Sequence, residues 1–263
     1  MSHFFTLVVA PKNLKFEDVD MFVEKQLAPY NEELQVEEHD SNCYCINSIA
    51  LIAGARYADS LIPRNDASKV SEWYSIRDNF ALQHSLYNKP DSTCEKCHAT
   101  GTYKSTSNPQ GEWDWYQLGG RWTGVLADYK PEADPDNQED CNICNGSGDR
   151  LEWVFYDNGE RKFKDDQSKQ CNGCNGCKGT GRSTKWPTDF KKFEGDISLV
   201  ANIDWSDDKI PYAIVTLDGK WHEKGTMEGF GISINEDKSW KEVARNLLKQ
   251  HKDCYAIVVD CHI

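Results

Sequence analysis

The chain has 263 residues, of which 38% are hydrophobic and 11% aromatic, and its formal net charge at pH 7 is −13. This composition is too polar for an integral membrane protein and too rich in aromatic residues for a disordered one. The negative charge argues against a protein that coats duplex DNA, because such binding needs many contacts from Lys and Arg to phosphates.

The N-terminal segment predicts a strand followed by a helix. Residues 4–9 are β-branched and aromatic, and Pro11 and Asn13 end the run. Apolar residues then recur at helical spacing over residues 16–27, and Pro29 ends this helix. The start of the chain lacks the basic and long apolar regions of a secretory signal, so the sequence predicts a cytoplasmic protein.

The middle of the chain changes character near residue 88. Residues 46–57 and 68–87 predict two helices. From residue 89 to 192 the chain is rich in turns and cysteines, and residues 128–140 carry six acids, which predicts a solvated loop. The apolar run 49–55 is far shorter than the roughly 20 residues that span a membrane, so no membrane partner is predicted.

The C-terminal segment predicts a hairpin, a helix and a final strand. Residues 212–217 and 220–224 are the two arms of the hairpin, with Asp218-Gly219 as its tight turn. Ser239 is suited to cap a helix, and residues 254–261 predict a buried strand.

The order of these elements predicts the fold class. A β-α start and a β-β-α-β end predict an α+β protein with a ferredoxin-like, split βαβ core built from both termini. The predicted domains are residues 1–88 and 193–263, which share this core, and a zinc-stapled, loop-rich insertion over residues 89–192.

Cysteine is the most informative residue type in the composition. The chain has eleven cysteines, an odd number that excludes complete pairing into internal disulfides. In a reducing compartment, paired cysteines indicate metal binding more often than disulfides. Three copies of the pattern C-x-x-C-x-G-x-G begin at Cys94, Cys141 and Cys174, with Ala99 replacing the first glycine in the first copy. Two thiolates at this spacing can bind one Zn²⁺, and the glycines let the backbone turn tightly afterwards.

The repeats predict one or two structural zinc ions. The predicted ligands are Cys94, Cys97, Cys141, Cys144, Cys171, Cys174 and Cys177. In one arrangement the second and third copies share a zinc ion, and Cys94, Cys97, Cys171 and His98 hold another. In a second arrangement the first and third copies share a zinc ion, and Cys141 and Cys144 pair with Cys171. The alternative is reduced thiols in loops. A catalytic zinc is not expected, because four thiolates leave no open position for water.

The other cysteines are predicted to pack in the core. These are Cys43, Cys45, Cys254 and Cys261. Cys254 and Cys261 bracket a predicted strand, where a buried free cysteine behaves as a small hydrophobic residue.

The cysteine repeat resembles the zinc region of DnaJ-type co-chaperones. That family has one more copy of the repeat and shorter spacers, and this chain also lacks a His-Pro-Asp tripeptide. The resemblance implies structural zinc, and it does not imply a full DnaJ chaperone.

Residues 112–124 combine aromatic residues, three glycines and an arginine. The candidate ligand-binding residues are Trp113, Asp114, Trp115, Tyr116, Gly119, Gly120, Arg121 and Trp122. Aromatic walls, the planar fork of Arg121 and backbone N–H groups would suit a nucleotide-like ligand. Asp114 could orient Arg121 or pair with it, and Gly119-Gly120 lets the backbone turn sharply or approach something closely. The alternative is a Trp-rich hairpin that packs on the sheet.

The stretch 114–124, together with the cysteine repeats, resembles a group of largely uncharacterised phage and bacterial proteins. Residues 212–231 look similar too, so the resemblance covers most of the chain. It implies a phage-associated zinc protein of the host cytoplasm, with a host-takeover or anti-defence role, and it supplies no activity.

Residues 161–192 carry nine Lys and Arg against three Asp, a net charge of +6 in a chain of −13. A basic patch beside a zinc knuckle could contact RNA or single-stranded DNA. The alternative is a solvated loop face. The acidic remainder of the chain would suit docking on a basic host protein.

No common catalytic motif is present, whether a phosphate-binding loop, HExxH, GxSxG or GxGxxG. No catalytic residue is therefore named. The sequence predicts a zinc-stabilised binding or accessory protein that engages a host protein or a nucleotide-like small molecule. One alternative is a nucleotide- or nucleic-acid-processing enzyme that binds phosphate through Arg121. Another is a DnaJ-like module that binds unfolded chains.

Overall fold

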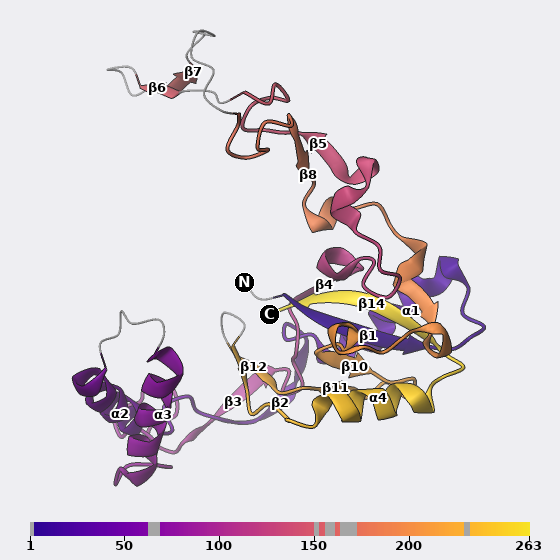
Figure 1. Cartoon of the computed structure of the whole chain (residues 1–263). Coiled ribbons are helices and arrows are strands. Elements are labelled where there is room, and N and C mark those ends of the chain that lie inside the picture. The colour runs from indigo at the N-terminus through magenta and orange to yellow at the C-terminus, as the bar shows by residue number, and fades with distance from the viewer. Residues whose placement is uncertain (1–2, 63–68, 150–152, 156–160, 164–172, 229–231) are drawn as a thin grey trace. The chain divides into compact units, whose positions relative to one another are not determined.

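The computed structural model describes residues 3–62, 69–149, 153–155, 161–163, 173–228 and 232–263 (Figure 1). The chain divides into two compact units, one formed by residues 1–34 and 109–263 and the other by residues 35–108. These boundaries differ from the sequence-based division after residues 88 and 192.

A mixed sheet forms the core of the first unit. Its strands lie in the order β11-β10-β1-β14-β4, and β9 also pairs with β14. Their bounds are β1 His3–Ala10, β4 Trp115–Leu118, β9 Ile197–Leu199, β10 Ala213–Val215, β11 Trp221–Glu223 and β14 Tyr255–His262. β1 and β14 pair antiparallel along their whole length, so the prediction that both ends of the chain share one sheet is confirmed.

One helix packs on each face of this sheet. Val23 of α1 (Val19–Leu27) shares a buried cluster with Phe4, Val8 and Ala10 of β1. The alternate residues of β1 face the other way, where α4 (Trp240–Gln250) contributes Trp240, Ala244 and Leu248 to a second buried cluster with Phe5, Leu7 and Val9. Because β1 is apolar on both faces, both faces need a cover.

The α+β class is confirmed, but the split arrangement predicted for the core is wrong. β10 lies directly beside β1 and runs parallel to it, so no strand separates the two, and the helices cover opposite faces. The physical reason is burial. The three residues of β10 are buried, whereas those of β11 are half-buried and include His222 and Glu223, which a sheet edge tolerates.

Small two-stranded antiparallel sheets also belong to the first unit. They pair β5 (Gln138–Asp140) with β8 (Arg182–Thr184), β6 (Trp153–Phe155) with β7 (Arg161–Phe163), and β12 (Thr226–Glu228) with β13 (Ile232–Ile234). Single 3-10 turns link many of these strands, among them Gly120–Trp122 and Glu194–Asp196.

The second unit holds a two-stranded ribbon and two packed helices. β2 (Gln35–Asn42) pairs antiparallel with β3 (Thr102–Ser107), and α2 (Ser48–Leu61) packs on α3 (Val70–Gln83). Both helices lie close to their predicted positions. A Cβ at Gly54 would lie 2.3 Å from the carbonyl oxygen of Arg77, so this glycine lets the two helices approach closely.

Candidate metal centres and binding segment

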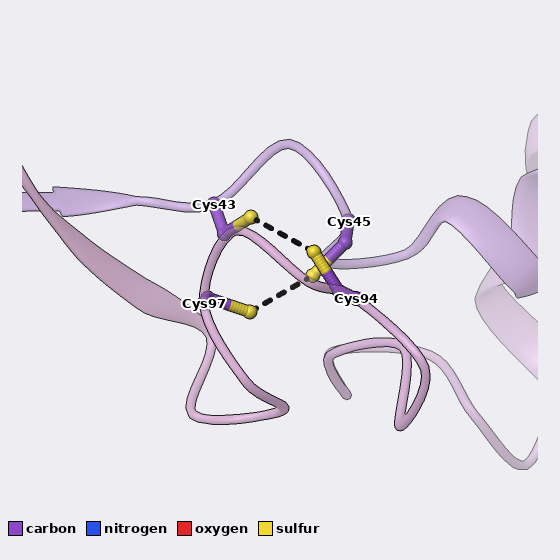
Figure 2. A group of neighbouring side chains, drawn as sticks. All are labelled: Cys43, Cys45, Cys94 and Cys97. Atoms are coloured by element: carbon purple, nitrogen blue, oxygen red, sulfur yellow. Dashed lines mark hydrogen bonds between the residues drawn. The ribbon is translucent and has the colours of Figure 1, made fainter.

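The first cysteine cluster lies at one end of the β2–β3 ribbon. Cys43 and Cys45 follow β2, and Cys94 and Cys97 precede β3 (Figure 2). The sulfur atoms of Cys43 and Cys94 are 3.6 Å apart, and those of Cys45 and Cys97 are 3.4 Å apart. All four sulfur atoms lie within 4.8 Å of one another.

The second cluster joins the second and third copies of the repeat. The sulfur atoms of Cys141 and Cys174 are 3.9 Å apart, those of Cys144 and Cys177 are 3.8 Å apart, and all four cysteines are buried. The two copies also exchange backbone hydrogen bonds, because Cys174 N donates to Gly148 O at 2.7 Å and Cys141 N to Gly181 O at 2.9 Å.

The three repeats adopt the same backbone conformation after their second cysteine. In each, the first, second and fourth following residues have positive φ, with values of 50°, 80° and 77° for Asn145, Gly146 and Gly148. His98 and Ala99 take the same region at 48° and 64°, although neither is glycine. The fourth residue donates its N–H to the sulfur atom of the second cysteine, at 3.3 Å from Gly148 and 3.2 Å from Gly181.

These distances fit metal coordination rather than disulfide bonds. Four thiolates at about 2.3 Å from a zinc ion form a tetrahedron with sulfur–sulfur edges of about 3.8 Å. In each cluster the two sulfur–sulfur distances given above, which range from 3.4 to 3.9 Å, are close to that edge and far longer than a disulfide bond of about 2.05 Å. Each cluster is therefore a closed four-cysteine site that could hold one structural metal ion.

One thiol in each cluster is poised to ionise. Burial raises the pKa of Cys177, but N–H groups of Gly181 and Gly179 and the neighbouring thiols outweigh it and leave the pKa at about 6. In the first cluster burial likewise raises the pKa of Cys97, which the backbone of Gly101 and the other thiols bring to about 7. Burial raises the pKa of Cys45 to about 12, so a bound cation is needed to ionise all four thiols at neutral pH.

The structure brings six of the seven predicted metal ligands into the two clusters, and Cys171 lies outside the described residues. The first arrangement placed the second and third repeats together, and the structure does the same. The second arrangement, which joined Cys94 and Cys97 to the third repeat, is wrong. His98 is not part of either cluster.

Cys43 and Cys45 correct the sequence-based interpretation. We expected them to pack in the core, and they instead complete the first cluster with Cys94 and Cys97. The sequence signal for this is Cys43-Tyr44-Cys45, two cysteines close together in a chain whose other closely spaced cysteines are predicted metal ligands. Cys261 does lie in the core of the first unit, and Cys254 packs against that core.

The aromatic segment 113–122 belongs to the sheet rather than to a separate insertion. β4 pairs with the end of β14. Trp113 is buried and donates its indole N–H to Leu27 O at 3.0 Å, and Trp122 stacks on Phe5 with ring centroids 5.5 Å apart. Trp113 and Trp122 therefore pack within the first unit, as the alternative interpretation of this segment predicted.

Gly119 and Gly120 bring the backbone against two buried aspartates. Their φ values are 70° and 56°. A Cβ at Gly119 would lie 2.5 Å from Asp196 Oδ2, and one at Gly120 would lie 2.5 Å from Asp260 Cβ. The close approach expected of this glycine pair is therefore made to the protein's own carboxylates.

Arg121 and Asp114 do not pair as expected. The backbone N–H of Arg121 donates to Asp260 Oδ2 at 3.0 Å, and its side chain is exposed. Asp114 Oδ1 lies 2.5 Å from Nδ1 of His262. His262 and His3 are in edge contact, with centroids 5.0 Å apart, and His3 Nδ1 is 3.0 Å from Asp260 Oδ1.

A cavity of about 300 Å³ lies beside β4. Tyr116, Gln117, Gly119 and Gly120 of the predicted segment line it, whereas the three tryptophans and Arg121 do not. Asp196, from the turn Glu194–Asp196, lines it as well.

Several residues of the basic segment 161–192 pair with acids of the same unit. Arg182 binds Asp140 at 2.5 Å, Lys191 binds Asp136 at 2.7 Å, and Lys192 binds Asp20 at 3.1 Å. Lys164 and Lys169 lie outside the described residues. Part of the predicted basic patch is thus neutralised within the chain.

Within the described residues, no helix is long and apolar enough to cross a membrane. Comparisons of the chain with protein-family models, with curated proteins and with solved structures found no match.

Proposed function

We propose that this chain is a zinc-stabilised binding protein in which two four-cysteine sites each hold a structural zinc ion. The observation that supports this most is that each cluster brings four sulfur atoms within 4.8 Å of one another, with pairs 3.4 to 3.9 Å apart. Thiolate-rich tetrahedral sites favour zinc among the common divalent ions.

The second cluster also supports a stabilising role for the metal. Among the described residues, its buried group consists of the four cysteines, without an aliphatic or aromatic side chain. Zinc binding by such sites can contribute roughly 10–16 kcal/mol, which here would replace a hydrophobic core. A closed site of four thiolates has no position for substrate, so it favours binding over zinc catalysis.

Metal analysis of freshly purified protein tests the proposal. We expect two zinc ions per chain, one for each cluster. Cys43→Ser and Cys174→Ser should each lose one zinc ion, and Cys254→Ser, outside both clusters, should lose none. Less than about one zinc ion per chain, or full zinc content in Cys174→Ser, would contradict it.

We further propose, from the resemblance to phage-associated proteins, that the partner is a basic host protein. The net charge of −13 supports this, as do the internal ion pairs that neutralise part of the basic segment. Affinity capture from host cytosol should yield one protein that forms a complex of defined stoichiometry. That complex should weaken as salt is raised to about 0.5 M, because surface charges are then screened. If the affinity of the complex does not change with salt, the proposal that charge attracts the partner is refuted.

A further inference from the structure

The two cysteine clusters differ in their exposure to solvent. In the first cluster Cys94 is partly exposed, whereas Cys43, Cys45 and Cys97 are at most 3% exposed. In the second cluster all four cysteines are buried, and none is more than 6% exposed. The oxidation of a thiolate depends on its contact with the oxidant. Cys94 is therefore the first of the eight cluster ligands that an oxidant in solution meets.

A second thiol lies within reach of Cys94. The sulfur atom of Cys43 is 3.6 Å away, and Figure 2 shows the two side chains directed toward each other. To form a disulfide bond these sulfur atoms need to approach by only about 1.5 Å. Cys43 follows β2 and Cys94 precedes β3, so the bond would join segments that the β2–β3 ribbon already holds together.

The second unit depends on the first cluster for its core. The buried cluster found among its described residues consists of Cys43, Cys45 and Cys97, with Cys94 and Tyr103 packed against it. The two buried clusters that are rich in aliphatic side chains belong to the first unit. A metal ion bound to these thiolates would therefore take the place of a hydrophobic core in the second unit.

The helices of the second unit do not supply a core of their own. The buried residues described in α2 and α3 are small, namely Ala50, Gly54, Ala58 and Ala81. Larger apolar side chains face solvent, and Ile52, Leu61 and Leu82 are 53%, 55% and 56% exposed. Both helices are inserted between Cys45 and Cys94, so the two ends of this insertion meet at the cluster.

We propose that the first cluster is a peroxide-sensitive switch. Oxidation that starts at Cys94 releases the zinc ion of this cluster and unfolds the second unit, while the second cluster and the first unit persist. The inference rests on the proposed function, because it takes both clusters to hold zinc.

The oxidation is balanced with hydrogen peroxide as the oxidant. The Cys94 thiolate attacks one peroxide oxygen, the O–O bond breaks, and a sulfenic acid and a hydroxide ion form. The Cys43 thiolate then attacks the sulfur atom of this sulfenic acid, the S–O bond breaks, and a disulfide and a second hydroxide ion form. Two thiolates have lost two electrons in total, and one peroxide has gained them. The zinc ion keeps two of its four ligands, which is too few to hold it in a structural site.

The rate of zinc release from the zinc-loaded full chain in excess hydrogen peroxide tests the inference. A chromogenic zinc indicator follows the release. Cys254→Ser serves as the background, because Cys254 is partly exposed and would consume peroxide outside both clusters. We expect one zinc ion per chain to leave in a fast phase and the other at least about tenfold more slowly. Equal rates for the two zinc ions would overturn the inference.

Two ligand variants assign the phases to the clusters. Cys174→Ser keeps the first cluster and should show the fast phase alone, whereas Cys43→Ser keeps the second cluster and should show the slow phase alone. The reverse assignment would overturn the inference. After one equivalent of peroxide, peptide mapping should find a disulfide between Cys43 and Cys94. A disulfide between Cys94 and Cys97, or none, would refute the oxidation step.

Hydrogen exchange measures the structural consequence. After the fast phase, α2 and α3 should lose protection, and β1 and β14 should keep theirs because a hydrophobic cluster holds them. Protection that persists in α2 and α3 would refute the switch. Reduction by excess dithiol in zinc-containing buffer should restore it, and an irreversible loss would show damage instead of a switch.

The two proposals fail in different ways. Freshly purified protein without zinc would refute the zinc-stabilised function. Protein that holds two zinc ions and releases both at one rate would refute the switch and leave the zinc-stabilised function standing.

Discussion

Gly120 is the position where a single methyl group tests the geometry of the sheet edge most directly. Its φ of 56° is a conformation that costs an L-residue about 1 kcal/mol. A Cβ there would lie 2.5 Å from Asp260 Cβ and 2.6 Å from Oδ2. Asp260 is 1% exposed and accepts the N–H of Arg121, so it has little room to move.

We therefore expect Gly120→Ala to lower the free energy of unfolding by about 2–4 kcal/mol. About 1 kcal/mol comes from the backbone conformation, and about 1–3 kcal/mol comes from overpacking against the buried aspartate.

Gly219→Ala is the matched control for this variant. Gly219 also has a positive φ, of 81°, but the nearest atom to its Cβ position is Gln26 Oε1 at 3.3 Å, the end of a flexible side chain. This variant should lose only about 1 kcal/mol. Urea unfolding in zinc-containing buffer, followed by tryptophan fluorescence, measures both values. If the two variants lose the same free energy within about 0.5 kcal/mol, the steric reasoning is refuted.

Three further predictions follow from other parts of the molecule. Ala99→Gly should raise the free energy of unfolding of the zinc-loaded protein by about 0.5–1 kcal/mol, because Ala99 has a φ of 64°. A decrease in this free energy, as expected for the control Ala55→Gly in α2, would contradict this. Burial, together with the charge and hydrogen bond of Glu223, raises the pKa of Glu112 from 4.5 to about 7, so the folded state binds the extra proton. Stability should therefore fall as pH rises from about 4.5 to 7, and Glu112→Gln should flatten this slope in urea titrations; an unchanged slope would argue against the carboxyl pair. A zinc chelator should remove hydrogen-exchange protection from residues 141–148 and 174–181 but not from β1 and β14, whose clusters are hydrophobic; equal loss in both regions would refute this division.

Local elements of the fold were predictable from residue patterns. The strand at residues 4–9, the helix after it, the hairpin at Asp218-Gly219 and the final strand all appear near their expected positions. The order of strands was not predictable, because β10 joins β1 across about two hundred residues of intervening chain. Which of two consecutive strands becomes the inner one depends on burial in the assembled sheet.

The binding segment shows the same limit. Its glycine pair predicted a close backbone approach, and the structure contains one. The sequence could not identify Asp196 and Asp260 as the groups approached, because both are distant in the chain.

The sequence by itself determined the three cysteine repeats and their turns, because two ligands three residues apart and the glycines after them are set by local backbone geometry. Only the tertiary structure decided which half-sites meet. Cys43 lies 51 residues from Cys94, and it reaches that repeat because β2 and β3 pair as neighbours. Metal ligation needs four sulfur atoms at one point in space, and for the first cluster that point is set by strand pairing rather than by ligand spacing.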